Sequence, residues 1–147
     1  MPRFASLRVV AVAALLLPLF ACGRRSAPPL VAATSPITVD IKCEGGVSVG
    51  LTDASGKSAW SVALKKNDPI EWLVPDNIIS IDISAKGTGA WPLDDVKPHG
   101  SKKAQPAKSK VKSDAAAGTY AYLIETVCQR ADGTTINVTI DPDMIVL

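Results

Sequence analysis

The sequence predicts an all-β fold, an antiparallel Greek-key β-sandwich of about seven strands with one long Lys-rich loop. Three observations predict it. Apolar residues alternate with polar residues through most of 37–147, turn-forming segments separate these runs, and nothing after residue 22 has the 3.6-residue period of an amphipathic helix. A segment of about 110 residues is long enough for one domain with a single hydrophobic core.

The first five strands are expected between residues 37 and 84. Turn signals at Asp53–Lys57, Asn67–Pro69 and Pro75–Asn77 separate them. Trp60 and Trp72 lie in apolar runs, so both are expected in the core. The strand faces are predicted to carry Ile37, Val39, Ile41 and Cys43, then Val47, Val49 and Leu51, then Trp60, Val62 and Leu64, then the run Ile70–Val74, and finally Ile79, Ile81 and Ile83.

Two further strands are expected near the end of the chain. A turn over Ala131–Thr134 joins them as a hairpin. The first strand is predicted to place Tyr120, Tyr122, Ile124, Thr126 and Cys128 on one face, and the second Ile136, Val138 and Ile140.

Residues 91–118 interrupt the alternation. Their lysines stand among Pro, Ala, Ser and Gly, so little burial offsets the entropy of ordering them, and we expect a long solvated loop whose Lys-rich part is 97–112. The alternative is a contact surface for anionic lipid or an acidic partner, with about 1 kcal/mol per Lys close to a charged membrane. The candidate contact surface comprises Trp91, Lys97, Lys102, Lys103, Lys108, Lys110 and Lys112.

Cys43 and Cys128 are expected to form a disulfide. Each lies in the inward phase of its predicted strand, and no Cys-x-x-Cys motif or nearby His indicates a redox or zinc site. Closing a loop of about 85 residues stabilises a domain by roughly 4 kcal/mol in the chain-entropy model.

Residues 1–22 have the order of a secretory signal. Arg3 and Arg8 precede the apolar run Val9–Phe20, and the small residue Ala21 follows it. Removing this segment removes two basic residues and no acidic ones, so the formal net charge of +2 falls to about zero. We therefore expect no nucleic-acid partner.

The stretch Leu19–Gly23 resembles the lipobox of bacterial lipoproteins, in which a Cys follows apolar and small residues. The resemblance implies lipidation of Cys22, a membrane partner through that N-terminal lipid, and sorting to an outer membrane facing the periplasm. A plain signal peptide cut after Ala21 is the alternative. Residues 23–36, rich in Pro and small residues, are interpreted as a tether of up to about 40 Å, and 37–147 as the domain.

The residues that common catalytic and metal sites require are scarce. His99 is the single histidine and is expected to be an exposed one in the Lys-rich loop. The acidic pairs Asp94–Asp95 and Asp141/Asp143 lie beside prolines in turns, and for Asp141–Asp143 a local turn is favoured over a calcium site. We expect no catalytic residue, no metal and no cofactor.

Two blocks resemble cupredoxin-type sandwiches. Lys66–Trp72 is similar to the charged turn and apolar-x-Trp run of such domains, and Gly118–Tyr122 to their Gly-x-Tyr-x-Tyr strand. Asp141–Val146 also looks like the end of small cupredoxin-like proteins. A blue-copper site needs two His and a Cys, and neither His nor Met follows at Gln129–Gly133. The resemblance therefore implies a cupredoxin-like or immunoglobulin-like fold without electron transfer, in which Cys128 serves the disulfide.

Ile41–Gly46 is similar to the opening strand of periplasmic lysozyme-inhibitor lipoproteins. The function expected is that of a non-catalytic, lipid-anchored envelope protein, a binding or structural module whose partner is an envelope protein or an anionic surface. The alternative is an inhibitor of a cell-wall-acting enzyme such as lysozyme.

Overall fold

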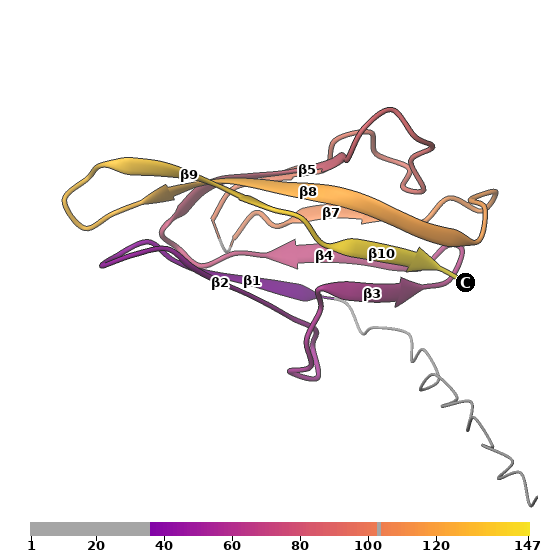
Figure 1. The fold of residues 1–147 in the computed structure, drawn as a ribbon, viewed down its shortest axis with the longest axis horizontal. Coiled ribbons are helices and arrows are strands. Elements are labelled where there is room, and N and C mark those ends of the chain that lie inside the picture. Colours follow the sequence, from indigo (N-terminus) through magenta and orange to yellow (C-terminus); the bar gives the residue numbers. More distant parts are fainter. Residues whose placement is uncertain (1–35, 103) are drawn as a thin grey trace, which may run out of the picture.

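The computed structural model describes residues 36–102 and 104–147, and over these residues the fold is all-β (Figure 1). The predicted signal segment, lipobox and tether, together with Lys103, lie outside the described residues. Two sheets pack face to face, with a common core between them. The predicted two-sheet β-sandwich class is therefore confirmed.

The described residues form ten strands, where the sequence predicted about seven. They are β1 (Ile37–Lys42), β2 (Ser48–Thr52), β3 (Ser61–Leu64), β4 (Pro69–Leu73), β5 (Ile78–Ala85), β6 (His99–Gly100), β7 (Ala107–Lys110), β8 (Gly118–Gln129), β9 (Thr135–Ile140) and β10 (Asp143–Val146). One sheet has the order β2-β1-β4-β7, and the other has the order β3-β10-β8-β5-β6 with β9 also paired to β8. The pairs β1–β4 and β3–β10 are parallel, so the sheets are mixed rather than wholly antiparallel.

Strand β8 is the central strand of the second sheet. It pairs with β5 along one side, and with β9 and then β10 along the other. The register is continuous, because Ile140 opposes Ile124 and Asp143 opposes Ala121. Pro142 separates β9 from β10 because it has no N–H for the ladder, although its carbonyl accepts a 3.1 Å bond from the Tyr122 N–H. This proline accounts for one of the additional strands.

The core is centred on an aromatic pair. Trp72 and Tyr122 are fully buried, with ring centroids 6.1 Å apart in an edge-to-face arrangement. The Trp72 indole N–H lies 3.5 Å from the Tyr122 hydroxyl oxygen, and burial raises the pKa of Tyr122 to about 12. The inward phase predicted for the first strand and for β8 is confirmed, since Ile37, Val39 and Ile124 are all buried.

Three residues predicted on apolar strand faces are exposed instead. Val47 is 53% exposed, because it precedes β2, which begins at Ser48. The other two are exposed because the backbone departs from regular strand geometry. Trp60 is 43% exposed, since the chain bends just before β3 and buries Ala59 instead. Ile79 is 39% exposed, because a shift in the β5–β8 register between Ile78 and Ser80 turns Ile78 inward in its place.

The segment 91–118 differs from the expected long solvated loop. It contains β6 and β7, and a bridge joins Leu93 to Val111, both fully buried. Gly100 makes the close approach of β6 to β7 possible, because a Cβ there would lie 2.4 Å from the Ala107 nitrogen. This segment therefore passes from the second sheet to the first and closes one lateral side of the sandwich.

Candidate functional site

The predicted disulfide between Cys43 and Cys128 is present and joins the two sheets. Their Cα atoms lie 6.5 Å apart, and both residues are buried next to the Asn77 side chain. The side-chain amide of Asn77 donates to the backbone carbonyl of Ile41 at 3.4 Å. The backbone carbonyl of Asn77 accepts a 2.8 Å bond from the Gln129 N–H. The bridge is thus set in a hydrogen-bonded frame that links the end of β1 to the end of β8.

Two charged residues extend this frame into the neighbouring turns. Arg130 Nε donates to the Cys43 carbonyl at 3.1 Å, and the Ala131 N–H donates to Glu44 Oε1 at 2.5 Å. The turn after β1 and the turn after β8 are therefore held together beyond the disulfide itself. The sequence analysis missed Glu44 and Arg130, because a contact between residues so far apart in the chain leaves no local pattern. We call this group the disulfide clamp: Cys43, Glu44, Asn77, Cys128 and Arg130.

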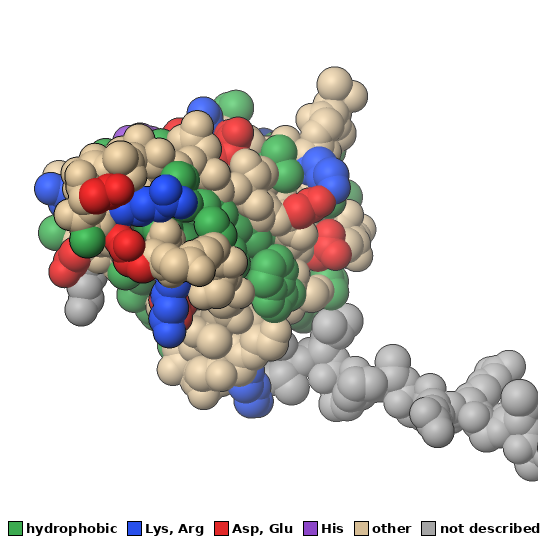
Figure 2. Space-filling view, turned by 60° about the vertical axis from the view of Figure 1, so that its left-hand side comes forward, with side chains coloured by type: hydrophobic (Ala, Val, Ile, Leu, Met, Phe, Trp, Pro, Cys, Tyr) green, Lys and Arg blue, Asp and Glu red, His purple; other side chains and the backbone are tan. Residues whose placement is uncertain are grey.

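Most of the predicted lysine surface is paired with acceptors from the same chain. Lys97 lies 3.6 Å from Asp82, Lys108 3.1 Å from Glu71 and Lys110 3.5 Å from Asp94, while Lys112 donates to the Trp91 carbonyl at 3.0 Å. Lys102 is exposed, and Lys103 is outside the described residues. Figure 2 shows basic and acidic side chains next to one another on the face it displays. The lysines therefore lie among acids rather than forming a field of one sign.

Trp91 is partly buried. Its indole N–H donates to the Asp95 carbonyl at 2.6 Å, and its ring packs against the edge of the core. Trp91 thus helps to fold the loop that precedes β6. The structure brings Trp91 and Lys112 together and places Lys97 elsewhere, on the outer face of the second sheet.

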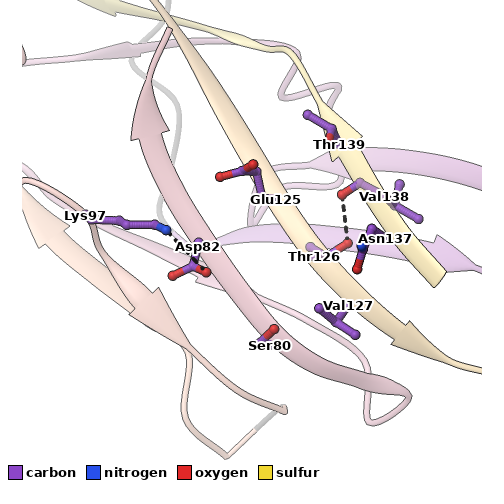
Figure 3. Close-up of a pocket in the computed structure, with 9 residues that line it drawn as sticks. All are labelled: Ser80, Asp82, Lys97, Glu125, Thr126, Val127, Asn137, Val138 and Thr139. Carbon is purple, nitrogen blue, oxygen red and sulfur yellow. Dashed lines mark hydrogen bonds and ion pairs between the residues drawn. The ribbon is translucent and has the colours of Figure 1, made fainter. Parts of the chain in front are cut away.

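A polar hollow of about 410 Å³ lies on that outer face (Figure 3). Ser80 and Asp82 come from β5, three residues each from β8 and β9 complete the floor, and Lys97 closes one side. The full lining is Ser80, Asp82, Lys97, Glu125, Thr126, Val127, Asn137, Val138 and Thr139. Strand alternation explains its polarity, because the intervening residues of β5 and β8 face the core.

The sheet register aligns four polar residues in one row across the hollow. Asp82 opposes His99 on β6 and Glu125 on β8, and Glu125 opposes Thr139 on β9. Two carboxylates directly opposite one another repel. Asp82 Oδ1 lies 2.8 Å from His99 Nδ1, and Asp82 Oδ2 lies 3.6 Å from the Lys97 ammonium. The predicted lone histidine is therefore exposed but paired.

The hollow presents hydroxyl, amide, carboxylate and ammonium groups without an aromatic wall. Such a surface is suited to a polar ligand that has both hydrogen-bond donors and acceptors. Within the described part of the chain, no three His, Cys, Asp or Glu side chains come together in a way that could hold a metal ion. No helix in residues 36–102 and 104–147 is long and apolar enough to cross a membrane.

Comparison with known proteins adds no relative to this description. No protein-family model matches the chain, and no curated protein matches it. The fold and the site together define an all-β, two-sheet sandwich with one disulfide clamp and a polar hollow.

Proposed function

We propose that this chain is a non-catalytic, lipid-anchored protein of the bacterial cell envelope, attached through Cys22 to the outer membrane and facing the periplasm. The pairing of Cys43 with Cys128 is the observation that supports this proposal most. Disulfides persist in oxidising compartments, and the pairing of these two cysteines supports the assignment of Cys22 to lipidation. More than one acyl chain would make such an anchor durable.

The domain is proposed to act as a binding or structural module. Lys97 belongs both to the predicted lysine surface and to the lining of the polar hollow, so we assign the contact surface to the region where the two meet. The mixture of Asp82, Glu125 and Lys97 there favours a polar envelope protein over an anionic lipid surface, because a lipid head group would meet the two acids as well as the lysine.

The anchor is tested with a single substitution. Full-length protein and its C22S variant are produced in a Gram-negative host, and the membrane and soluble envelope fractions are compared. We expect the wild-type protein in the membrane fraction with the added mass of a lipid, and C22S in the soluble fraction without it. A wild-type chain that ends without lipid at Cys22 contradicts the proposal.

The binding role is tested on the same full-length protein. The K97E variant is expected to lose most capture of its envelope partner, whereas K57E, which changes an exposed lysine of the β2–β3 turn, is the matched control. Unchanged capture by K97E argues against this contact surface. Strong inhibition of lysozyme by the purified protein contradicts the module assignment and favours an inhibitor.

A further inference from the structure

The outer edge of β9 has no strand partner among the described residues. One edge of β9 pairs with β8, and no pairing is formed on the other. The same side of the sheet is covered further along, where β3 pairs with β10 and the Trp60 carbonyl accepts a 2.9 Å bond from the Asp143 N–H. The uncovered edge therefore extends from the β8–β9 turn to Trp60.

Strand alternation identifies the backbone groups on this edge. The Asp143 N–H points outward to β3, and the Val138 carbonyl points to β8, where it accepts a 3.2 Å bond from Thr126 Oγ1. In an antiparallel ladder, successive residues direct their N–H and C=O groups to opposite sides. The outward groups of β9 therefore belong to Thr135, Asn137 and Thr139, and they are positioned to accept another strand.

The sequence along this edge carries no protection against pairing. Residues 134–140 read TTINVTI, with β-branched residues at most positions and with no charge, proline or glycine. Natural edge strands usually carry lysines, prolines or bulges that prevent association. Strand β7, the edge of the other sheet, carries Lys108 and Lys110 and so follows that rule. Strand β9 departs from it.

We propose that two copies of this protein pair through β9, antiparallel, about a two-fold axis at Asn137. This register sets Thr135 opposite the partner's Thr139, so Thr–Thr pairs flank the axis, and such pairs are favourable in sheets. No like charges oppose one another, because Asp141 falls opposite the partner's Gly133 and is already paired with Lys86. Since no charged residue of β9 would repel a second copy in this register, a second copy of this chain is the occupant that we assign.

The length of the uncovered edge also fits this arrangement. In this register the partner's Ala131–Thr134 turn ends beside Trp60, where β3 begins to cover the sheet. Trp60 is 43% exposed and lies where it can pack against that turn. Pairing over so short an edge buries less than a standard interface of about 1,200–2,000 Å², so the dimer is expected to be weak and concentration-dependent.

Sedimentation of the full chain in detergent micelles, corrected for bound detergent, tests the pairing. We expect wild-type protein to shift from monomer to dimer with rising concentration. N137K places two lysines at the axis and is expected to stay monomeric, whereas T119K, on the outer face of β8 away from this edge, is expected to dimerise like the wild type. A wild-type chain that is monomeric throughout, as it would be if its own residues 23–36 covered β9, overturns the proposal.

Cross-linking gives a second measurement that does not depend on a disruptive charge. N137C is expected to form a disulfide-linked dimer under mild oxidation, because the two Asn137 Cα atoms would lie about 5.5 Å apart across the axis. T119C is the control and is expected to remain monomeric. A dimer that persists in N137K, or equal cross-linking of N137C and T119C, overturns the assignment to β9.

Discussion

The two lateral sides of the sandwich differ in how their strand edges are covered. On one side, β6 and β7 connect the sheets. Lys108 is paired with Glu71 of β4, and Lys110 with Asp94 of the loop before β6. On the other side, β9 presents an uncharged edge of six residues, and the disulfide clamp holds its hairpin. The first side is closed by packing and charge, whereas on the second, the open side, β9 is cross-linked through its hairpin and its outer edge has no partner among the described residues. An exposed edge of this kind can accept another strand.

The largest expected effect comes from removing the disulfide. The double variant C43A/C128A should lose about 2–5 kcal/mol of unfolding free energy, because the denatured chain is no longer constrained. The loss should act most on the open side, since Cys128 lies opposite Ile136 of β9 in the β8–β9 hairpin. Urea denaturation measures the first effect, and hydrogen exchange should show β9 amides opening more readily than those of β7. Equal loss of protection in both strands would remove the distinction between the two sides.

A substitution at Gly100 should disrupt the packing of β6 against β7 on the closed side. G100A should destabilise the protein by about 1–3 kcal/mol, because the new Cβ would lie 2.4 Å from the Ala107 backbone nitrogen and 2.5 Å from the Gln105 carbonyl oxygen. G50A is the matched control, since its Cβ would meet only the Asp40 Cβ at 3.9 Å. Thermal unfolding compares them. A G100A protein as stable as G50A would mean that β6 and β7 are not closely packed.

The smallest expected effect is a pH dependence in the turn of the open side. Asp132 Oδ1 accepts bonds from the Thr134 hydroxyl at 2.6 Å and the Thr134 N–H at 2.9 Å, and these bonds hold the pKa of Asp132 below its ordinary value. Because the pKa of Asp132 is lower in the folded state, its carboxylate stabilises the protein at a pH above the unfolded-state pKa of about 3.9. This contribution is lost as the pH falls through the folded-state pKa.

The D132N variant checks this dependence. Its melting temperature should fall less than that of the wild type between pH 5 and pH 2. Asp53 has a lowered pKa for a similar reason, a bond from the Ser55 hydroxyl in the β2–β3 turn, so D53N gives a comparison away from β9. An identical acid response in D132N and the wild type would show that the Asp132 turn contributes nothing.

The sequence predicts the buried faces well and the contacts between distant strands poorly. Period-two alternation locates β1 and β8 because each has one face in the core. The alternation fails at Trp60 and Ile79, where a bend and a bulge change the phase without a local signal. It also fails across 97–112. Gly100 and Ala107 pack closely there because they are small, whereas a composition rich in small residues is typical of a loop.

The candidate site was predicted only in part for the same reason. The disulfide partners could be found because each cysteine lies in the inward phase of its predicted strand and no redox or zinc motif surrounds it. The row that contains Asp82, His99 and Glu125 depends on the register of three strands, and no segment of the sequence encodes that register by itself. Lys97 was predicted as a contact residue from the sequence, but its proximity to Asp82 could be found only from the fold.

If the domain is anchored through its N-terminus as proposed, the position of the disulfide has a mechanical consequence. Tension that enters at Ile37 would first shear β1 from β2 and β4. The covalent link at Cys43 would stop this separation of β1 after about seven residues. The added length would be roughly 25 Å at about 3.4 Å per residue. Force would then pass into β8, the longest strand of the domain and the one that pairs with β5, β9 and β10. The disulfide thus limits how far the domain can extend before further extension requires the second sheet to unfold.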